Sequence, residues 1–214
     1  MLCSASDPAA LDEAARLLRQ GGLIAFPTET YYGLGVDPFN AQALQRLFAV
    51  KQRQTDKAIL VLVADQAQVI DLVAEVPAVL QQLMHHFWPG PLTLVFPGRA
   101  SLPTLLTGGT GNIGIRQSSH PFAARLLSTF GGPITATSAN RSGAPPATTA
   151  AEVQESFGSE IDFILDGGTT PGGAGSTLVS CDQQQQLHCL REGAVPFGEI
   201  FESAGSRNCF SCGA

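Results

Sequence analysis

Short apolar runs alternate with amphipathic stretches along almost the whole chain. In the first amphipathic stretch, Asp7 and Pro8 provide an N-cap and a first helical residue, and apolar positions then recur at the helical period until Gly21. The same period predicts helices from Asn40, from Asp65, after Pro121, and over residues 77–87, 149–157 and 196–202. Apolar runs without that period predict strands over residues 23–27, 59–64, 92–96, 112–116, 133–137, 161–165, 177–180 and 187–190.

The alternation of helices and strands predicts an α/β fold, a twisted, mixed open sheet packed with helices. No internal repeat interrupts the pattern, and no stretch is long enough to act as a linker between domains. A length of 214 residues suits one compact domain. We therefore predict a single domain over residues 1–205 and a flexible C-terminal tail over residues 206–214.

Composition indicates a folded chain in a reducing compartment. With 44% hydrophobic and 14% charged residues, the chain can build a core and does not resemble a disordered protein. Its apolar runs are too short to cross a bilayer, and no cationic segment precedes an apolar block at the N-terminus, so we expect no membrane insertion and no signal peptide. Five scattered cysteines are typical of reduced thiols and predict a cytoplasmic protein. Cys209 and Cys212 form a lone C-x-x-C, which is a weak metal or redox signal.

The distribution of charge indicates a ligand. A net charge of −6 offers no general attraction for nucleic acid. Yet Lys51 and Lys57, the only lysines, lie close together with Arg53 between them. Such cations make charge-assisted contacts of roughly 1.5–3 kcal/mol each with a phosphate. A solvated helix end is the alternative, but the clustering of all the lysines favours an anion site.

Three further regions place small hydroxyl, amide or cationic residues after predicted elements: residues 26–35, residues 135–143, and residues 175–177 together with 191–193. Open α/β sheets collect ligands in the loops beyond their strand ends, although ordinary turns are the alternative for each region. The chain has no G-x-x-x-x-G-K-[ST], no zinc-ligand spacing and no G-x-S-x-G. These patterns alone indicate an α/β protein that binds a phosphorylated anion.

Seven motifs in order carry more information than any one of them: FPTETYYGLGVD, KQRQTDKAILVLVA, WPGPLTLVF, IGIRQSSHP, TATSANRSGAPP, GSTLV and REGA. Together they resemble the YrdC-like family of threonylcarbamoyl-adenylate synthases, in its short single-domain form. The resemblance implies a nucleotidyltransferase that converts L-threonine, bicarbonate or CO2, and ATP to threonylcarbamoyl-AMP and pyrophosphate. It also implies a link to a complex that transfers threonylcarbamoyl to the adenosine at position 37 of tRNA.

The resemblance further implies roles for single residues of these motifs. Lys51 and Arg53 are implied as catalytic cations. The implied ATP contacts are Arg53, Lys57, Asn112, Ser138, Asn140 and Arg191. The implied threonine contacts are Thr28, Arg116 and Ser176, with Arg116 holding the carboxylate through its planar fork. Mg²⁺ is expected to arrive with ATP, without a metal ligand from the protein.

Three positions depart from the family pattern. Gln54 replaces the proline of K-x-R-P, Ser118 replaces the proline of R-x-P, and Tyr31 stands where a small aliphatic residue is common. We expect Tyr31 to affect the pocket most. Two alternatives stay open. One is a paralogue of the same fold that is non-catalytic or has an altered activity, and the other is an RNA-binding module. Weak direct binding of RNA also stays open. The intact K-x-R and S-x-N elements and the acidic net charge favour the synthase.

Overall fold

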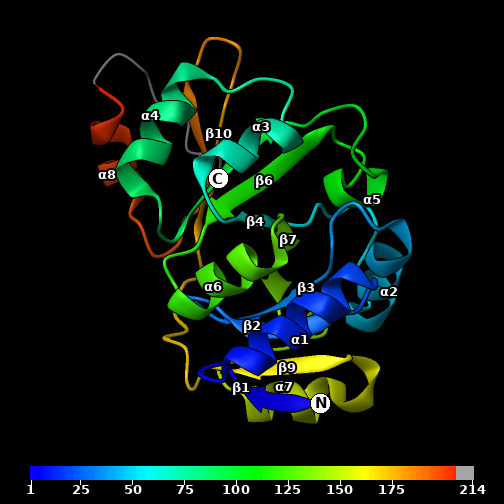
Figure 1. The fold of residues 1–214 in the computed structure, drawn as a ribbon. Coiled ribbons are helices and arrows are strands. Elements are labelled where there is room, and N and C mark those ends of the chain that lie inside the picture. Colours follow the sequence, from blue (N-terminus) through cyan, green and yellow to red (C-terminus); the bar gives the residue numbers. More distant parts are fainter. Residues whose placement is uncertain (206–214) are drawn as a thin grey trace.

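Two mixed β-sheets form the frame of the protein in the computed structural model, which describes residues 1–205 (Figure 1). Sheet A has the strand order β1-β9-β2-β3-β8, with bounds Leu2–Ser4, Phe163–Asp166, Ile24–Pro27, Tyr32–Gly35 and Thr137–Ser138. Sheet B has the order β11-β10-β5-β6-β4-β7, with bounds Leu187–Arg191, Thr177–Cys181, Leu92–Pro97, Asn112–Gln117, Val61–Val63 and Ile134–Thr135. The mixed α/β class is thus confirmed, while the division of the strands into two sheets is a feature that the apolar pattern does not indicate.

Helices cover both sheets. They are α1 Pro8–Arg19, α2 Ala41–Lys51, η1 Gln66–Gln68, α3 Val69–Leu72, α4 Ala78–Phe87, α5 Thr104–Thr107, α6 Pro121–Phe130, α7 Ala150–Phe157, η2 Gly158–Glu160 and α8 Phe197–Ser203. In Figure 1, α1 and α6 lie against sheet A, whereas α4 and α8 lie side by side next to sheet B. Sheet A is also covered by α7 on the side away from α1.

Capping residues set where several helices begin. The Asp7 side chain accepts a hydrogen bond from the Ala9 amide at 3.0 Å, and Asn40 does the same for Ala43 at 3.0 Å. Thr149 and Glu152 form a reciprocal capping box at the start of α7. Each cap satisfies an amide that the first helical turn leaves without a partner, so the predicted starts of these helices are confirmed.

Strand β2 lies at the centre of sheet A and is buried on both faces. Ile24 and Phe26 pack into the layer formed with α1 and α6, whereas Ala25 faces the larger core on the other side. All three side chains have no exposed surface. This double burial explains why the sequence here is a continuous apolar run without polar alternation.

The predicted strand over residues 133–137 is divided between the two sheets. Strand β7 pairs with β4 in sheet B, and β8 pairs with β3 in sheet A. Ala136 separates them, and its amide donates to the Leu60 carbonyl at 2.8 Å. The chain therefore passes from one sheet to the other within three residues.

Strand β3 falls in a region that the sequence analysis treats as a loop. A Cβ atom at Gly35 would lie 2.7 Å from both Ile134 Cγ2 and Phe26 Cε1, so a glycine is needed for the strands to pack this closely. Gly35 is therefore a packing residue.

Within residues 1–205, no helix combines the length and the apolar character needed to cross a bilayer. The predicted tail over residues 206–214, which contains Cys209 and Cys212, lies outside the described residues. Its separation from a single domain over residues 1–205 stays a prediction.

Candidate functional site

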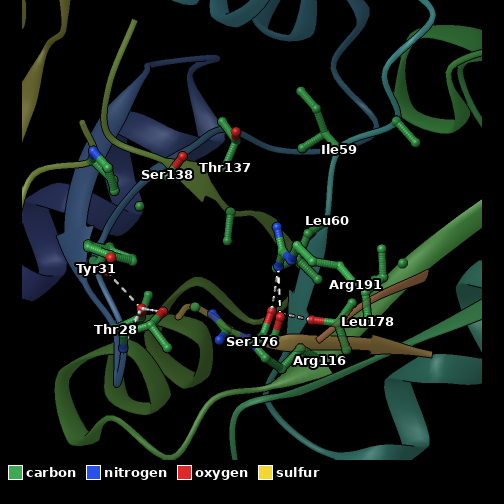
Figure 2. Close-up of a pocket in the computed structure, with 18 of the residues that line it drawn as sticks. Thr28, Tyr31, Ile59, Leu60, Arg116, Thr137, Ser138, Ser176, Leu178 and Arg191 are labelled. Atoms are coloured by element: carbon green, nitrogen blue, oxygen red, sulfur yellow. Dashed lines mark hydrogen bonds between the residues drawn. The ribbon is translucent and has the colours of Figure 1, made fainter. Parts of the chain in front are cut away.

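A cavity of about 660 Å³ lies where the two sheets face each other (Figure 2). Sheet A contributes the β2–β3 turn, β3 and β8, and sheet B contributes β5, β6, β10 and β11. The cavity brings together seven of the residues predicted for the site: Thr28, Arg53, Asn112, Arg116, Ser138, Ser176 and Arg191. Residues far apart in the sequence thus meet around one space of a size suited to a small-molecule ligand.

Ser176 lies directly before β10 and is held by neighbours on both sides. Its hydroxyl is 2.9 Å from the Thr93 hydroxyl, and Arg191 Nη2 donates to the Ser176 carbonyl at 2.8 Å (Figure 2). Only 5% of Ser176 is exposed. The Arg191 guanidinium is therefore fixed at the cavity wall by its contact with the Ser176 main chain.

The β2–β3 turn presents Thr28 to the opposite side of the cavity. The Thr28 hydroxyl donates to the Tyr31 carbonyl at 2.7 Å and accepts from the Thr30 amide at 3.2 Å. The Thr30 hydroxyl also lies 3.2 Å from the Thr28 hydroxyl, so the turn fixes Thr28 at the cavity wall. Tyr31 also lines the cavity, and its hydroxyl donates to the Gly173 carbonyl in the glycine-rich connection between β9 and β10.

Arg53 reaches the cavity from the segment that follows α2. Its Nε donates to the Lys57 carbonyl at 3.1 Å, and its Nη2 donates to the Ala58 carbonyl at 2.7 Å. Burial lowers the pKa of Arg53, although a guanidinium stays charged at neutral pH. These contacts orient a cation toward the ligand space before any ligand arrives.

The structure places Lys51 outside the cavity. Its ammonium lies inside the protein and donates to the carbonyls of Ser138 and Asn140, the latter at 2.7 Å, and to Asn140 Oδ1 at 3.2 Å. Only 2% of the residue is exposed, and it is absent from the cavity lining. Burial and, second, the charge of Arg53 lower the pKa of Lys51 to about 7. Lys51 thus holds the serine–asparagine loop instead of facing the ligand space.

Lys51 and Arg53 point to different places because of the residue between them. Gln52 is the C-cap of α2 and has a left-handed backbone conformation, with φ of 53°. This turn lets the Arg53 amide donate to the Phe48 carbonyl at 3.0 Å. The K-x-R element therefore directs Lys51 into the protein interior and Arg53 toward the cavity, which the sequence alone does not indicate.

Two further predicted ATP contacts lie outside the lining. Lys57 is exposed, and its carbonyl supports Arg53. Asn140 accepts from the Ser138 hydroxyl at 2.6 Å, and its Nδ2 donates to the Ala144 carbonyl at 2.6 Å. Because both polar ends of the Asn140 side chain are occupied within its own loop, it shapes the loop that presents Ser138.

Sequence reasoning missed several residues of this site. Thr93 is 1% exposed, lines the cavity and pairs with Ser176. A threonine in the apolar run of β5 is the signal that could have identified it. Glu29 was also missed, although it lies 3.0 Å from Arg116 as its ion-pair partner. A carboxylate between two threonines in a predicted loop gave no indication of that partner.

Gly193 of the REGA motif allows the closest approach of backbone at this site. A Cβ atom there would lie 2.4 Å from the Ser176 carbonyl carbon and 2.5 Å from the Thr177 nitrogen, neither of which can move alone. We predict that Gly193→Ala lowers the free energy of unfolding by about 1–3 kcal/mol and displaces Ser176. Gly198→Ala is the control, because a Cβ there meets nothing within 4 Å. Equal melting temperatures for the two variants would contradict the prediction.

Comparison with known proteins gives consistent matches. The family Sua5_yciO_yrdC, described as Telomere recombination, matches residues 16–193. Threonylcarbamoyl-AMP synthase of Pyrococcus abyssi is 39% identical over 192 residues, which cover 90% of this chain and 56% of that protein. The protein of the same name from Halorhodospira halophila is 41% identical over 160 residues, covering 75% of this chain and 84% of that protein.

A solved structure agrees with the sequence comparison. The crystal structure of P. abyssi Sua5 complexed with L-threonine superposes with a TM-score of 0.87 at 38% identity, covering 92% of this chain and 58% of that chain. The present chain thus spans little more than half the length of the Pyrococcus protein and most of the length of the Halorhodospira protein.

Proposed function

Because the chain belongs to the Sua5/YciO/YrdC family, we propose that it makes threonylcarbamoyl-AMP from L-threonine, bicarbonate or CO2, and ATP. The observation that carries the proposal is the convergence of three guanidinium groups, those of Arg53, Arg116 and Arg191, on one cavity lined with hydroxyl groups. Arginine forks suit both phosphate and carboxylate, and this reaction requires both to be held together.

The proposed reaction has two steps. The threonine amine first adds to CO2, which forms a carbamate and releases a proton. A carbamate oxygen then attacks the α-phosphorus of ATP; the new P–O bond forms as the bond to the β-phosphate oxygen breaks, and pyrophosphate leaves. No enzyme nucleophile takes part, so catalysis rests on positioning and on positive charge near the phosphates.

The side chains suit distinct parts of these substrates. Arg53 and Ser138 are proposed to contact the nucleotide phosphates, with Asn112 and Arg191 as further ATP contacts. Thr28, Arg116 and Ser176 are proposed to hold threonine. Lys51 and Asn140 are proposed to act through the loop that carries Ser138, since their polar groups are already bonded there.

Mg²⁺ is proposed to enter as part of the MgATP substrate. Among residues 1–205, no three His, Cys, Asp or Glu side chains gather into a metal-binding group. The groups that line the cavity are hydroxyls, an amide and guanidiniums, which suit anions. The ion would neutralise charge on the phosphates that the arginines contact.

The central test is mass spectrometry of the product after incubation with ATP, Mg²⁺, bicarbonate and L-threonine. We expect threonylcarbamoyl-AMP, with pyrophosphate release that requires both threonine and bicarbonate. Folded protein that gives neither product would overturn the proposal. Salt-sensitive retention of RNA without turnover would identify an RNA-binding module instead.

Amino-acid selectivity gives a second test. Serine lacks one methyl group of threonine, a difference worth about 10–200-fold in a hydrophobic pocket. Valine has a methyl group in place of the hydroxyl, and this methyl would face the polar side chains of Thr28 and Ser176, so valine can be rejected by up to about 10⁴–10⁵. We expect threonine to react fastest, serine slowly and valine hardly at all. Similar kcat/KM values for valine and threonine would remove Thr28 and Ser176 from the site.

The proposal also covers the enzyme that uses the product and the compartment in which the reaction takes place. Threonylcarbamoyl-AMP is a mixed anhydride, so a second enzyme that transfers its acyl group to tRNA is proposed to consume it. Cys3 and Cys181 are free thiols, which supports a reducing, cytoplasmic location.

A further inference from the structure

A buried polar group of three residues lies behind the threonine side of the cavity. Arg116 is 3% exposed, and its Nη1 lies 3.0 Å from Glu29 Oε1. The Ser118 hydroxyl donates to Glu29 Oε2 and accepts from the His120 amide at 3.2 Å. Ser118 is itself only 3% exposed, so this hydroxyl lies in the interior with both its donor and its acceptor functions in use.

This group joins the two walls of the cavity. Arg116 is on β6 of sheet B, and Ser118 follows just beyond the end of that strand. Glu29 comes from the β2–β3 turn of sheet A. Ser118 is one of the positions at which the chain departs from the family pattern, and a proline there would have no hydroxyl to donate to Glu29. The serine thus anchors one carboxylate oxygen while the other stays beside Arg116.

The ion pair leaves part of the guanidinium unused. Arg116 Nε and Glu29 Oε1 are both buried and have no hydrogen-bond partner within the described residues, although Nη1 and Oε1 are close. The pair is therefore poorly aligned for hydrogen bonding, and Nε–H has no partner although Arg116 lines the cavity. A buried donor without a partner calls for an explanation, and a ligand that binds there supplies one.

Charge at this wall points to the same kind of ligand. Two guanidiniums, Arg116 and Arg191, stand against the single carboxylate of Glu29. Burial lowers the pKa of His120, which keeps that neighbouring imidazole neutral near pH 7. The wall therefore has one net positive charge, which one carboxylate from a ligand would neutralise.

We propose that Glu29 and Ser118 are positioning residues, which hold Arg116 in place to bind the carboxylate of the amino-acid substrate. This inference rests on the proposed function. Glu29 supplies a fixed counter-charge without occupying Nε, and Ser118 prevents the Glu29 side chain from turning away. The two residues act through Arg116 and do not touch the substrate.

The first experiment compares L-threonine with L-threonine amide, which lacks the carboxylate. In Ser118→Ala we expect kcat/KM for threonine to fall about 10-fold while that for the amide changes little, so the preference for the carboxylate shrinks. KM for ATP should stay the same. Ser119→Ala is the matched control, because Ser119 is the exposed neighbour of Ser118. An equal loss for both amino-acid substrates would show a general structural effect and overturn the proposal.

Glu29→Gln distinguishes positioning from competition. If Glu29 only competed with the substrate for Arg116, removing its charge would lower KM for threonine. Positioning requires KM to rise, because the guanidinium is no longer held. A lower KM for threonine in Glu29→Gln would therefore contradict the inference.

A measurement without substrate separates this inference from the proposed function. In ¹⁵N spectra of the arginine side chains, a held guanidinium gives separate Nη signals, whereas free rotation averages them. We expect separate signals for Arg116, assigned with Arg116→Lys, and averaged signals in Ser118→Ala and Glu29→Gln. If the Arg116 signals are already averaged in the unsubstituted protein, Glu29 and Ser118 do not hold this guanidinium, and the inference is wrong whatever reaction the protein catalyses.

Discussion

Arg53→Ala is expected to lower kcat/KM by about 10²-fold or more. Arg53 is the cation of the K-x-R element that reaches the cavity, and one charge-assisted contact with a phosphate is worth up to ~3 kcal/mol. The variant also loses two hydrogen bonds to carbonyls in its own segment. That loss should cost about 1 kcal/mol of stability, or roughly 2–4 °C in melting temperature. Steady-state kinetics and thermal unfolding, measured on the same preparation, check both numbers.

Lys57→Ala is the matched control for Arg53→Ala. Lys57 belongs to the same basic segment, but it is exposed and does not line the cavity. We expect its kcat/KM to stay within a few-fold of the unsubstituted value, since an exposed charge contributes little. A loss as large as that of Arg53→Ala would show that the whole segment reaches the nucleotide. An active Arg53→Ala that unfolds much earlier would make Arg53 a structural residue.

Lys51→Met is expected to reduce stability strongly and activity with it. Methionine fills a similar volume but leaves the partly buried carbonyls of Ser138 and Asn140 without their donor. Losses of this kind cost about 1–3 kcal/mol for each group, so we expect a total of roughly 2–5 kcal/mol. The Ser138 loop should then exchange its amides faster, which hydrogen exchange would detect. If the variant keeps its stability but loses its activity, Lys51 contacts the substrate directly and the structural role is wrong.

The same lysine predicts a dependence of stability on pH. Its pKa is about 7 in the folded protein and about 10.5 ordinarily, so between these values the unfolded chain binds more protons. The free energy of unfolding contributed by this group should therefore rise from about pH 7 to about pH 10. Chemical unfolding of the unsubstituted protein and of Lys51→Met across this range isolates the contribution as a difference. A flat difference would show that the ammonium keeps its ordinary pKa when buried.

Much of the fold could be predicted because local signals and burial agree. Caps such as Asp7 and Asn40 mark helix starts in the sequence and form the expected hydrogen bonds in the structure. Continuous apolar runs such as β2 are strands because both their faces are covered. The two-sheet arrangement could not be predicted, because whether a short run of residues pairs with one strand or another depends on contacts distant in sequence. Strand β3 was missed for a related reason, since Gly35 serves close packing with residues distant in sequence.

The site could be predicted in its members but not in their orientation. Motif order identified Arg53 and Ser138, which both line the cavity. It could not show that Lys51 turns inward, because that direction depends on the left-handed conformation of Gln52. Nor could it pair Glu29 with Arg116, since the two belong to different sheets. Side-chain direction is a property of the assembled structure, whereas residue type is a property of the sequence.

The passage of the chain from β7 to β8 has a consequence for how this family can diversify. Thr135 belongs to sheet B and Thr137 to sheet A, and Ala136 alone connects them. The main-chain angles of this buried alanine therefore help to set the distance between the two sheets. Side chains on either wall can then change singly, and alter which ligand fits, without changing that spacing. Ligand preference and cavity width are in this way encoded by different residues, so one can evolve while the other stays fixed.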